Sequence, residues 1–206
     1  KSYEKAIAIN PDHAEAHNNL GNVLKDLGQL DAAVKSFEKT LTIKPDYAEV
    51  HNNLGLTLME LGQLDDAIKC YEKTLTLKPN YAEAHNNLGL ALMELGQIDV
   101  SIRSFDKALA IKPDYAGAHN NLGLALMELG QLDVSIRSFD KALAIKPDFA
   151  EANSNHGILM AVLKRMDEAL QSFERALVLN PELNFLLGNL LHSKMLLCVW
   201  DDLSSQ

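Results

Sequence analysis

An asparagine pair recurs along the chain inside the five-residue stretch His-Asn-Asn-Leu-Gly. The stretch occupies 17–21, 51–55, 85–89 and 119–123, so its copies are 34 residues apart. Asparagine is a mediocre helix former, but its amide is both a hydrogen-bond donor and an acceptor. Such a side chain can pair with both polar groups of one peptide unit, whatever the sequence of that peptide. The chemistry that such a pair could supply is therefore hydrogen bonding to a polypeptide backbone.

The same spacing extends over nearly the whole chain and predicts its domain organisation. A fixed period of this length is typical of a solenoid, in which each repeat buries its apolar face against its neighbours. We predict a partial repeat consisting of a second helix only, five full repeats, and a degenerate sixth repeat at a junction to a further C-terminal region: 1–13; 14–47, 48–81, 82–115, 116–149 and 150–183; and 184–206. Since an intact solenoid begins with a whole repeat or a cap, we expect a piece of a longer protein.

Each repeat is predicted to form two helices. In the second repeat the first helix follows Pro45, and we expect Asp46 to cap it and Glu49 to complete a capping box. It ends at Gly62, where the chain must enter a left-handed conformation. The second helix carries one aromatic residue that we expect to fill a recurring socket beside small residues. These aromatic residues are Phe37, Tyr71, Phe105, Phe139 and Phe173.

Composition and charge exclude several functions. A net charge of −9 gives no electrostatic reason to approach nucleic acid or an anionic membrane. The two cysteines, Cys70 and Cys198, match neither a disulfide scaffold nor a metal-ligand spacing. With no signal peptide or membrane-spanning run, we expect a cytoplasmic protein with reduced thiols.

The recurring histidines are not expected to bind metal. His17, His51, His85 and His119 lie on successive helix pairs, about 8–10 Å apart, too far to share one ion. We expect them to pack between repeats. The sequence contains no glycine-rich phosphate loop and no nucleophile motif. We therefore predict no catalytic residue, no metal and no cofactor in this chain.

The repeat resembles the tetratricopeptide repeat over residues 1–183, since the unit carries Leu-Gly (His156-Gly157 in the fifth copy), a later small residue, an aromatic residue, alanine and proline. The resemblance implies an all-α fold, a right-handed superhelical solenoid of antiparallel helix pairs. In this family the first helices line a concave groove and the second helices form the convex back. The resemblance also implies a protein or peptide partner in the groove.

The groove-facing positions of the first helix predict what the groove displays. The sixth position supplies the expected peptide-binding residues: Asn19, Asn53, Asn87, Asn121, Asn155 and Asn189. The twelfth and thirteenth positions line the groove with Met59, Met93 and Met127 and with Glu60, Glu94 and Glu128. Since packed helices lie ~8–10 Å apart, this ladder would meet an extended peptide at about every third residue. We expect weak, sequence-tolerant binding with a preference for apolar and basic side chains.

The sequence leaves alternatives to peptide binding open. The fifth-position asparagines are expected to face a different way and to stabilise the stack. The sixth-position asparagines could instead pair between adjacent repeats or with the following turn, in a scaffold that binds no peptide and associates with itself or a larger partner. Apolar surface at the exposed half-repeats would favour self-association. A clamp for a terminal carboxylate is disfavoured, because Lys25 is the one base among the acids of the groove.

The end of the chain carries a second, shorter resemblance. Asn189-Leu190 and His192, followed by Cys198-Val199-Trp200 and Asp202, are similar to the junction between repeats and catalytic region in O-linked N-acetylglucosamine transferases. That family commonly has Cys-Asp-Trp where Val199 departs from the pattern. The resemblance implies the substrate-recognition arm of a transferase that acts on Ser/Thr hydroxyls, with its chemistry beyond Gln206. It also matches the ladder asparagines to the groove asparagines that grip the substrate backbone.

Overall fold

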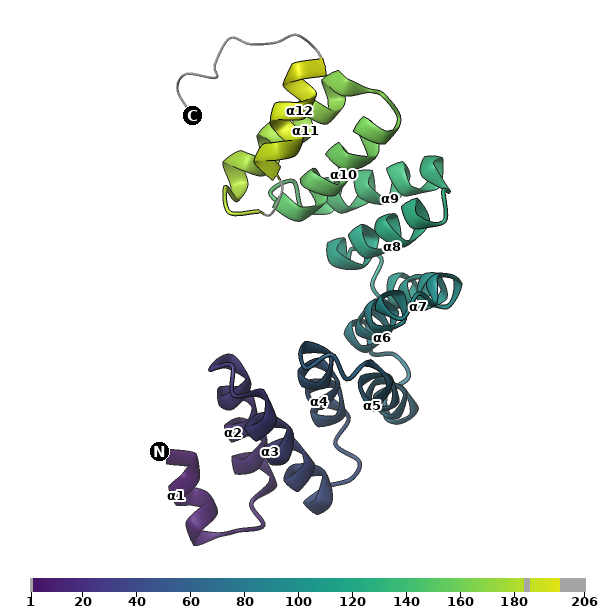
Figure 1. The fold of residues 1–206 in the computed structure, drawn as a ribbon. Coiled ribbons are helices and arrows are strands. Elements are labelled where there is room, and N and C mark those ends of the chain that lie inside the picture. Colours follow the sequence, from purple (N-terminus) through teal and green to yellow (C-terminus); the bar gives the residue numbers. More distant parts are fainter. Residues whose placement is uncertain (1, 184–185, 197–206) are drawn as a thin grey trace. The chain divides into compact units, whose positions relative to one another are not determined.

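The computed structural model describes residues 2–183 and 186–196, and these residues form twelve α-helices and no strands (Figure 1). The expected all-α fold is confirmed. Cys198, Val199, Trp200 and Asp202 lie outside the described residues. The helices are α1 (Ser2–Ile9), α2 (Ala14–Asp26), α3 (Leu30–Ile43), α4 (Ala48–Glu60), α5 (Leu64–Leu77), α6 (Ala82–Glu94), α7 (Ile98–Ile111), α8 (Ala116–Glu128), α9 (Leu132–Ile145), α10 (Ala150–Val162), α11 (Met166–Leu179) and α12 (Leu186–Leu196).

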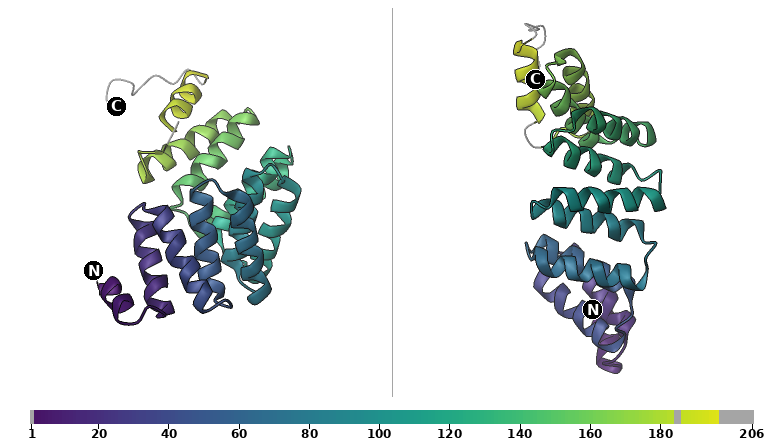
Figure 2. Two further views of the ribbon diagram at one scale, coloured as in Figure 1. Left: turned by 60° about the horizontal axis from the view of Figure 1, so that its bottom comes forward. Right: turned by 90° about the vertical axis from the view of Figure 1, so that its right-hand side faces the viewer.

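The helices divide between two compact units. The N-terminal unit, Lys1–Lys112, contains α1–α7, and the C-terminal unit, Pro113–Gln206, contains α8–α12. Within each unit every helix packs against the next one along the chain (Figure 2). The first helices of neighbouring repeats also touch: α2, α4 and α6 in one unit, and α8, α10 and α12 in the other. The first helices therefore form one layer of each unit, and the second helices pack against it.

The aromatic residue of each second helix fills the expected socket. All five rings are at most 1% exposed. Each ring lies directly against a glycine of the first helix of its repeat, as Phe37 does against Gly21 and Phe173 against Gly157. Full burial of such a ring contributes about 1.5–3 kcal/mol relative to leaving it exposed. These ring–glycine contacts hold the two helices of a repeat together.

The turn between the two helices requires a left-handed residue. Gly28, Gly62, Gly96 and Gly130 have φ of +70° to +73°, as the sequence predicts. The fifth repeat has Lys164 at this place, with φ of +61°. Because a side chain is strained in this conformation, the fifth turn carries strain that the other four avoid.

The expected capping boxes do not form. Helix α4 begins at Ala48, so its N-cap is Tyr47 and not Asp46, and no side chain caps the helix. The Pro-Asp pair is used one residue earlier, in the turn that leads into the helix. The Oε1 of Glu49 instead makes an ion pair with Nζ of Lys78, the residue directly after α5 (Leu64–Leu77), at 3.2 Å. The carboxylate thus joins two helices, and the prediction of its capping role was wrong.

Candidate functional site

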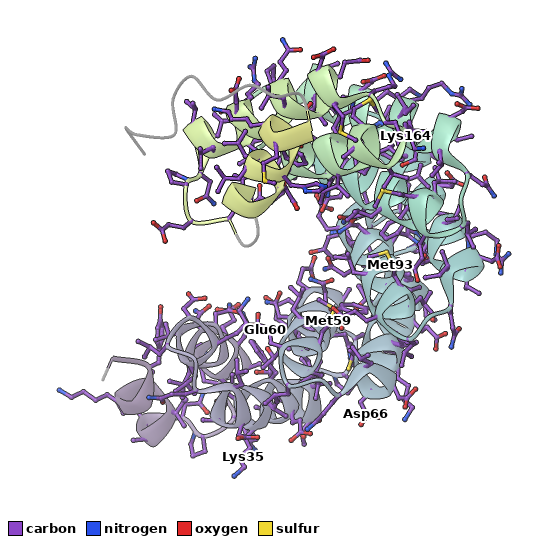
Figure 3. All side chains as sticks on the ribbon, turned by 45° about the horizontal axis from the view of Figure 1, so that its top comes forward. Lys35, Met59, Glu60, Asp66, Met93 and Lys164 are labelled. Carbon is purple, nitrogen blue, oxygen red and sulfur yellow. The ribbon has the colours of Figure 1, made fainter. Side chains whose placement is uncertain are left out.

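The predicted groove residues lie on the layer of first helices. Figure 3 shows Met59, Glu60 and Met93 on one side of the N-terminal unit, which we call the first-helix face, and Lys35 and Asp66 on the opposite side. Exposure divides the predicted residues. Glu60, Glu94 and Glu128 are exposed; Met59, Met93 and Met127 are half-buried; Asn19, Asn53, Asn121, Asn155 and Asn189 are half-buried; Asn87 is 9% exposed.

The sixth-position asparagines bind the preceding first helix. The Nδ2 of Asn87 donates to Oδ1 of Asn52 at 3.1 Å. In the C-terminal unit, Nδ2 of Asn155 donates to Oδ1 of Asn120 at 3.0 Å. These bonds join a sixth-position amide to the fifth-position amide one repeat earlier. The asparagines therefore link neighbouring first helices.

The two asparagines of a pair are also joined to each other. Asn86 donates through Nδ2 to Oδ1 of Asn87 at 3.5 Å, and Asn120 donates in the same way to Asn121 at 3.3 Å. Asn52, Asn86 and Asn120 of the fifth-position row are 5–6% exposed, whereas most sixth-position asparagines are half-buried, so the two rows differ in burial although their amides touch. Adjacent helical residues do not face each other, but the flexible amides reach across the gap between their side chains.

The first repeat uses a different acceptor, which the sequence did not reveal. Asn53 donates to Oδ1 of Asn22, at 3.2 Å, and Oδ1 of Asn18 is buried without a partner among the described residues. The only available signal was the identity of Asn22, because the equivalent positions of the later repeats carry leucine or isoleucine.

The hydrogen bonds of Asn87 do not use the whole capacity of its amide. An asparagine side chain offers two donor hydrogens and two acceptor lone pairs. Asn87 uses one hydrogen toward Asn52 and one lone pair toward Asn86. Within residues 2–183 and 186–196, one donor and one acceptor of this amide have no further partner, and this is the set that one peptide unit requires. The bonds to neighbouring asparagines also hold the amide in one orientation before any ligand arrives.

The recurring histidines bind the turn that precedes their own helix. The ring Nε2 donates to the carbonyl oxygen of the proline six residues earlier, at 2.8 Å from His51 to Pro45 and 2.9 Å from His119 to Pro113. In the fifth repeat Asn153 takes the place of histidine and also donates to its proline carbonyl, at 3.4 Å. Burial lowers the pKa of His85, which favours the neutral ring. The histidines thus fasten the start of each first helix.

A hollow adjoins the predicted binding residue of the C-terminal unit. It has a volume of about 270 Å³ and lies between α10 and α12, beside Asn189. Ile158, Ala161 and Val162 give it a largely apolar lining, and His192 stands on the α12 side. An aliphatic side chain fits such a space. The residues of α12 that line it were not predicted, apart from Asn189.

The remaining chemistry is sparse in the part of the chain that the structure describes. It contains no group of three His, Cys, Asp or Glu side chains placed to hold a metal ion. None of the described helices combines the length and apolarity needed to cross a bilayer. Burial raises the pKa of the Cys70 thiol to about 11, so it remains protonated near neutral pH.

Comparison with protein families decides the classification. A model described as TPR repeat matches residues 21–62, 55–96 and 89–130, and models described as tetratricopeptide repeat match 2–35 and 120–184. The chain belongs to the tetratricopeptide repeat (TPR) family. It is accordingly a TPR protein-interaction module. No curated protein matched the chain.

Solved structures show the same fold. MamA is 30% identical over 79% of this chain and 95% of its own, with a TM-score of 0.68. TTC0263, a thermophilic TPR protein of Thermus thermophilus, is 26% identical over 88% of this chain and 99% of its own, with a TM-score of 0.74. YrrB, described as a TPR protein with an unusual peptide-binding site, is 23% identical over 95% and 98%, with a TM-score of 0.69. The likeness to YrrB supports the fold alone.

Proposed function

We propose that the chain binds extended peptide segments on its first-helix face through the sixth-position asparagines. The observation that carries this proposal is the hydrogen bonding of Asn87, which fixes its amide in place and leaves one donor and one acceptor unused. A fixed amide loses less conformational entropy on binding than a free one. The partner is recognised through its backbone, so many sequences can bind.

Side-chain preferences follow from the surroundings of the asparagines. The exposed Glu60 and Glu94 favour basic side chains on the peptide, and the half-buried Met59 and Met93 favour apolar ones. The hollow beside Asn189 fits an aliphatic side chain in the C-terminal unit. Each net hydrogen bond contributes about 1 kcal/mol, and ordering the peptide costs several. Affinity for a short peptide is therefore weak. The preferences for basic, apolar and aliphatic side chains decide which peptides bind more tightly than others.

A backbone-modified peptide tests this recognition without altering the protein. A Ser/Thr-containing peptide would be compared by calorimetry with a version in which ester groups replace alternate amides, removing N–H donors but no side chain. We expect each ester that meets an asparagine to weaken binding about five-fold, the equivalent of about 1 kcal/mol. Equal affinity of the two peptides would exclude backbone recognition.

A second candidate is a scaffold in which the asparagines only join the repeats. The near-complete burial of Asn87, 9% exposed, favours this candidate. Two variants separate the alternatives, because Asn52→Ala and Asn87→Ala both remove the same inter-repeat hydrogen bond, while only Asn87→Ala removes the amide offered to a peptide. We expect similar losses of stability and a larger loss of peptide affinity in Asn87→Ala. An equal loss of affinity would support the scaffold.

We further propose that this TPR module is the substrate-recognition arm of an O-linked N-acetylglucosamine transferase-like protein. The support is the similarity of Asn189-Leu190, His192 and the stretch from Cys198 to Asp202 to the junction in that family. The test is the sequence encoded after Gln206 in the parent gene, where we expect an α/β region that binds a nucleotide sugar. An unrelated continuation would overturn the transferase proposal and leave peptide binding intact.

A further inference from the structure

A groove lies on the second-helix side of the N-terminal unit, between α5 and α7. It consists of two adjoining hollows of about 320 Å³ and 380 Å³, which share residues of α5, α6 and α7. The shared residues are Glu72, Leu88, Ser104 and Lys107. None of the residues that line the two hollows is one of the predicted residues of the first-helix face. This α5–α7 groove is therefore separate from that face.

The floor of the groove is apolar and helical. Leu88 and Leu92 of α6 line it, together with Leu95 just after that helix. Their spacing of four and three residues places them in one stripe. Leu95 is 37% exposed and Val100, beside it, 36%. The floor from His85 to Leu95 is about 15 Å long, at 1.5 Å per residue, which corresponds to about three turns of a helix lying on it.

The two walls carry opposite charges. Asp65 and Glu72 of α5 line one wall, and Arg103 and Lys107 of α7 line the other. None of these four side chains forms an ion pair with another residue in the described ranges 2–183 and 186–196. The groove thus presents unpaired acids and unpaired bases on either side of an apolar stripe.

We propose that the α5–α7 groove is a second docking surface, whose partner is an amphipathic helix. The apolar stripe of the partner would pack on Leu88, Leu92 and Leu95. Basic side chains on one flank of that stripe would face Asp65 and Glu72, and acidic side chains on the other flank would face the α7 wall. Charge complementarity on both flanks selects this partner over a uniformly basic or uniformly acidic helix.

The fifth repeat shows how the chain closes the equivalent place. The residue equivalent to Leu88 is His156, whose Nδ1 lies 2.9 Å from Oγ of Ser172. Its Nε2 lies 3.7 Å from Oδ1 of Asp140 on the other wall. Polar contacts therefore join α9, α10 and α11 in the C-terminal unit, whereas the equivalent helices α5, α6 and α7 of the N-terminal unit leave a groove. Because Ser104 and Glu72 are the equivalents of Ser172 and Asp140, Leu88→His should close the groove by the same contacts.

The probe is a covalently stapled helical peptide with a leucine stripe, lysines on one flank and glutamates on the other. Its binding to the whole chain would be measured by fluorescence anisotropy against two peptides with the same stripe, one with lysine on both flanks and one with glutamate on both. We expect the mixed peptide to bind at least about five-fold tighter than either, since exposed ion pairs contribute up to about 1 kcal/mol each. Equal affinity of all three peptides would overturn the proposal.

Protein variants locate the site. With Arg103→Glu/Lys107→Glu both walls become acidic, and we expect the lysine-flanked peptide to become the tightest ligand. The control Lys35→Glu/Lys141→Glu changes the net charge equally outside the groove and should keep the original preference. Leu88→His should abolish binding while the helical circular dichroism is retained. An unchanged preference in the first variant, or unchanged binding in the last, would place the peptide elsewhere.

One further comparison tests the helical form of the partner and its independence from the first-helix face. An unstapled peptide of the same composition with a central proline should not bind, and equal binding would contradict the helical partner. Asn87→Ala should leave binding of the mixed peptide unchanged. The proposal for the α5–α7 groove and the proposal for the first-helix face are therefore tested independently of each other.

Discussion

A Cβ atom on residue 89 would lie 2.5 Å from Cε1 of the Phe105 ring. Gly89 is in the first helix of its repeat and Phe105 is in the second, so the missing side chain allows the two helices to approach. The same relationship occurs in all five repeats, with hypothetical Cβ distances of 2.5–2.7 Å to the nearest ring carbon. The glycine of the repeated stretch is thus required by one close contact.

We predict that Gly89→Ala destabilises the N-terminal unit. The ring of Phe105 is fully buried and cannot move away without repacking its neighbours, so the free energy of unfolding should fall by about 1–3 kcal/mol. Urea unfolding followed by circular dichroism measures this change. The matched control is Gly188→Ala, because a Cβ there meets nothing within 4 Å. That variant should be neutral or more stable, and a loss equal to that of Gly89→Ala would argue against the steric explanation.

The turn of the fifth repeat predicts a stabilising substitution. Lys164 is exposed and holds φ at +61°, where the other four repeats have glycine. A non-glycine residue in this region costs about 1–2 kcal/mol. Glycine removes that cost but also raises the conformational entropy of the unfolded chain, which offsets part of the stabilisation. Lys164→Gly should therefore raise the free energy of unfolding by about 0.5–1 kcal/mol. The reverse change, Gly130→Lys, should lower it in the same urea experiment, and a gain from both changes would contradict the argument.

The buried aromatic residue of the second repeat is a tyrosine, whereas the other four full repeats have phenylalanine. Tyr71 is fully buried, its Oη has no hydrogen-bond partner among the described residues, and burial raises its pKa. Removing an unsatisfied buried polar group avoids a desolvation cost of about 1–3 kcal/mol. We predict that Tyr71→Phe raises the free energy of unfolding by about 1 kcal/mol and that Phe105→Tyr lowers it. A loss of stability in Tyr71→Phe would show that the hydroxyl has a partner in solution.

The fold was largely predictable from the sequence, because its signals are local and repeated. The 34-residue period, the ring at Phe37 and the glycine at Gly28 each specify a backbone or packing requirement within one repeat. The capping boxes failed because Asp46 and Tyr47 differ by one position, and the choice of N-cap depends on how the preceding turn packs. A sequence pattern alone does not resolve a shift of one residue.

The candidate site was predicted less completely, because its hydrogen bonds join different repeats. The sequence placed Asn52 and Asn87 in different rows of successive helices and left pairing between repeats as an alternative, but it did not show which amide of the preceding repeat would accept the hydrogen bond. It also gave no sign of the α5–α7 groove, which depends on the space left between two second helices. Contacts of this kind follow from the relative placement of helices, which periodicity does not fix.

The pH dependence of stability should reveal His156. Burial lowers the pKa of this ring below its ordinary value of 6.5, although Asp140 and Glu168 act in the opposite direction. The Ser172 hydroxyl donates to the Glu168 carbonyl at 2.8 Å, so it accepts a hydrogen bond from Nδ1 of the ring. The neutral ring therefore carries its proton on Nδ1, and an added proton at Nε2 would face Asp140.

The sign of the effect follows from proton binding. Because the folded-state pKa is lower, the unfolded chain binds more protons just below pH 6.5, and the free energy of unfolding should fall as the pH decreases from about 7 toward about 5. One group changes it by at most about 1.4 kcal/mol per pH unit. Amide hydrogen exchange of the C-terminal unit, measured across this pH range, would report the loss of stability.

The control is His156→Leu, which places at this position the residue that the preceding four repeats carry. Its C-terminal unit should lose less stability on acidification than that of the unaltered chain. His85, whose pKa is also lowered by burial, lies in the N-terminal unit and is unchanged in both proteins. Identical pH profiles for the C-terminal unit in the two proteins would show that the neutral His156 ring does not stabilise the packing of α9, α10 and α11.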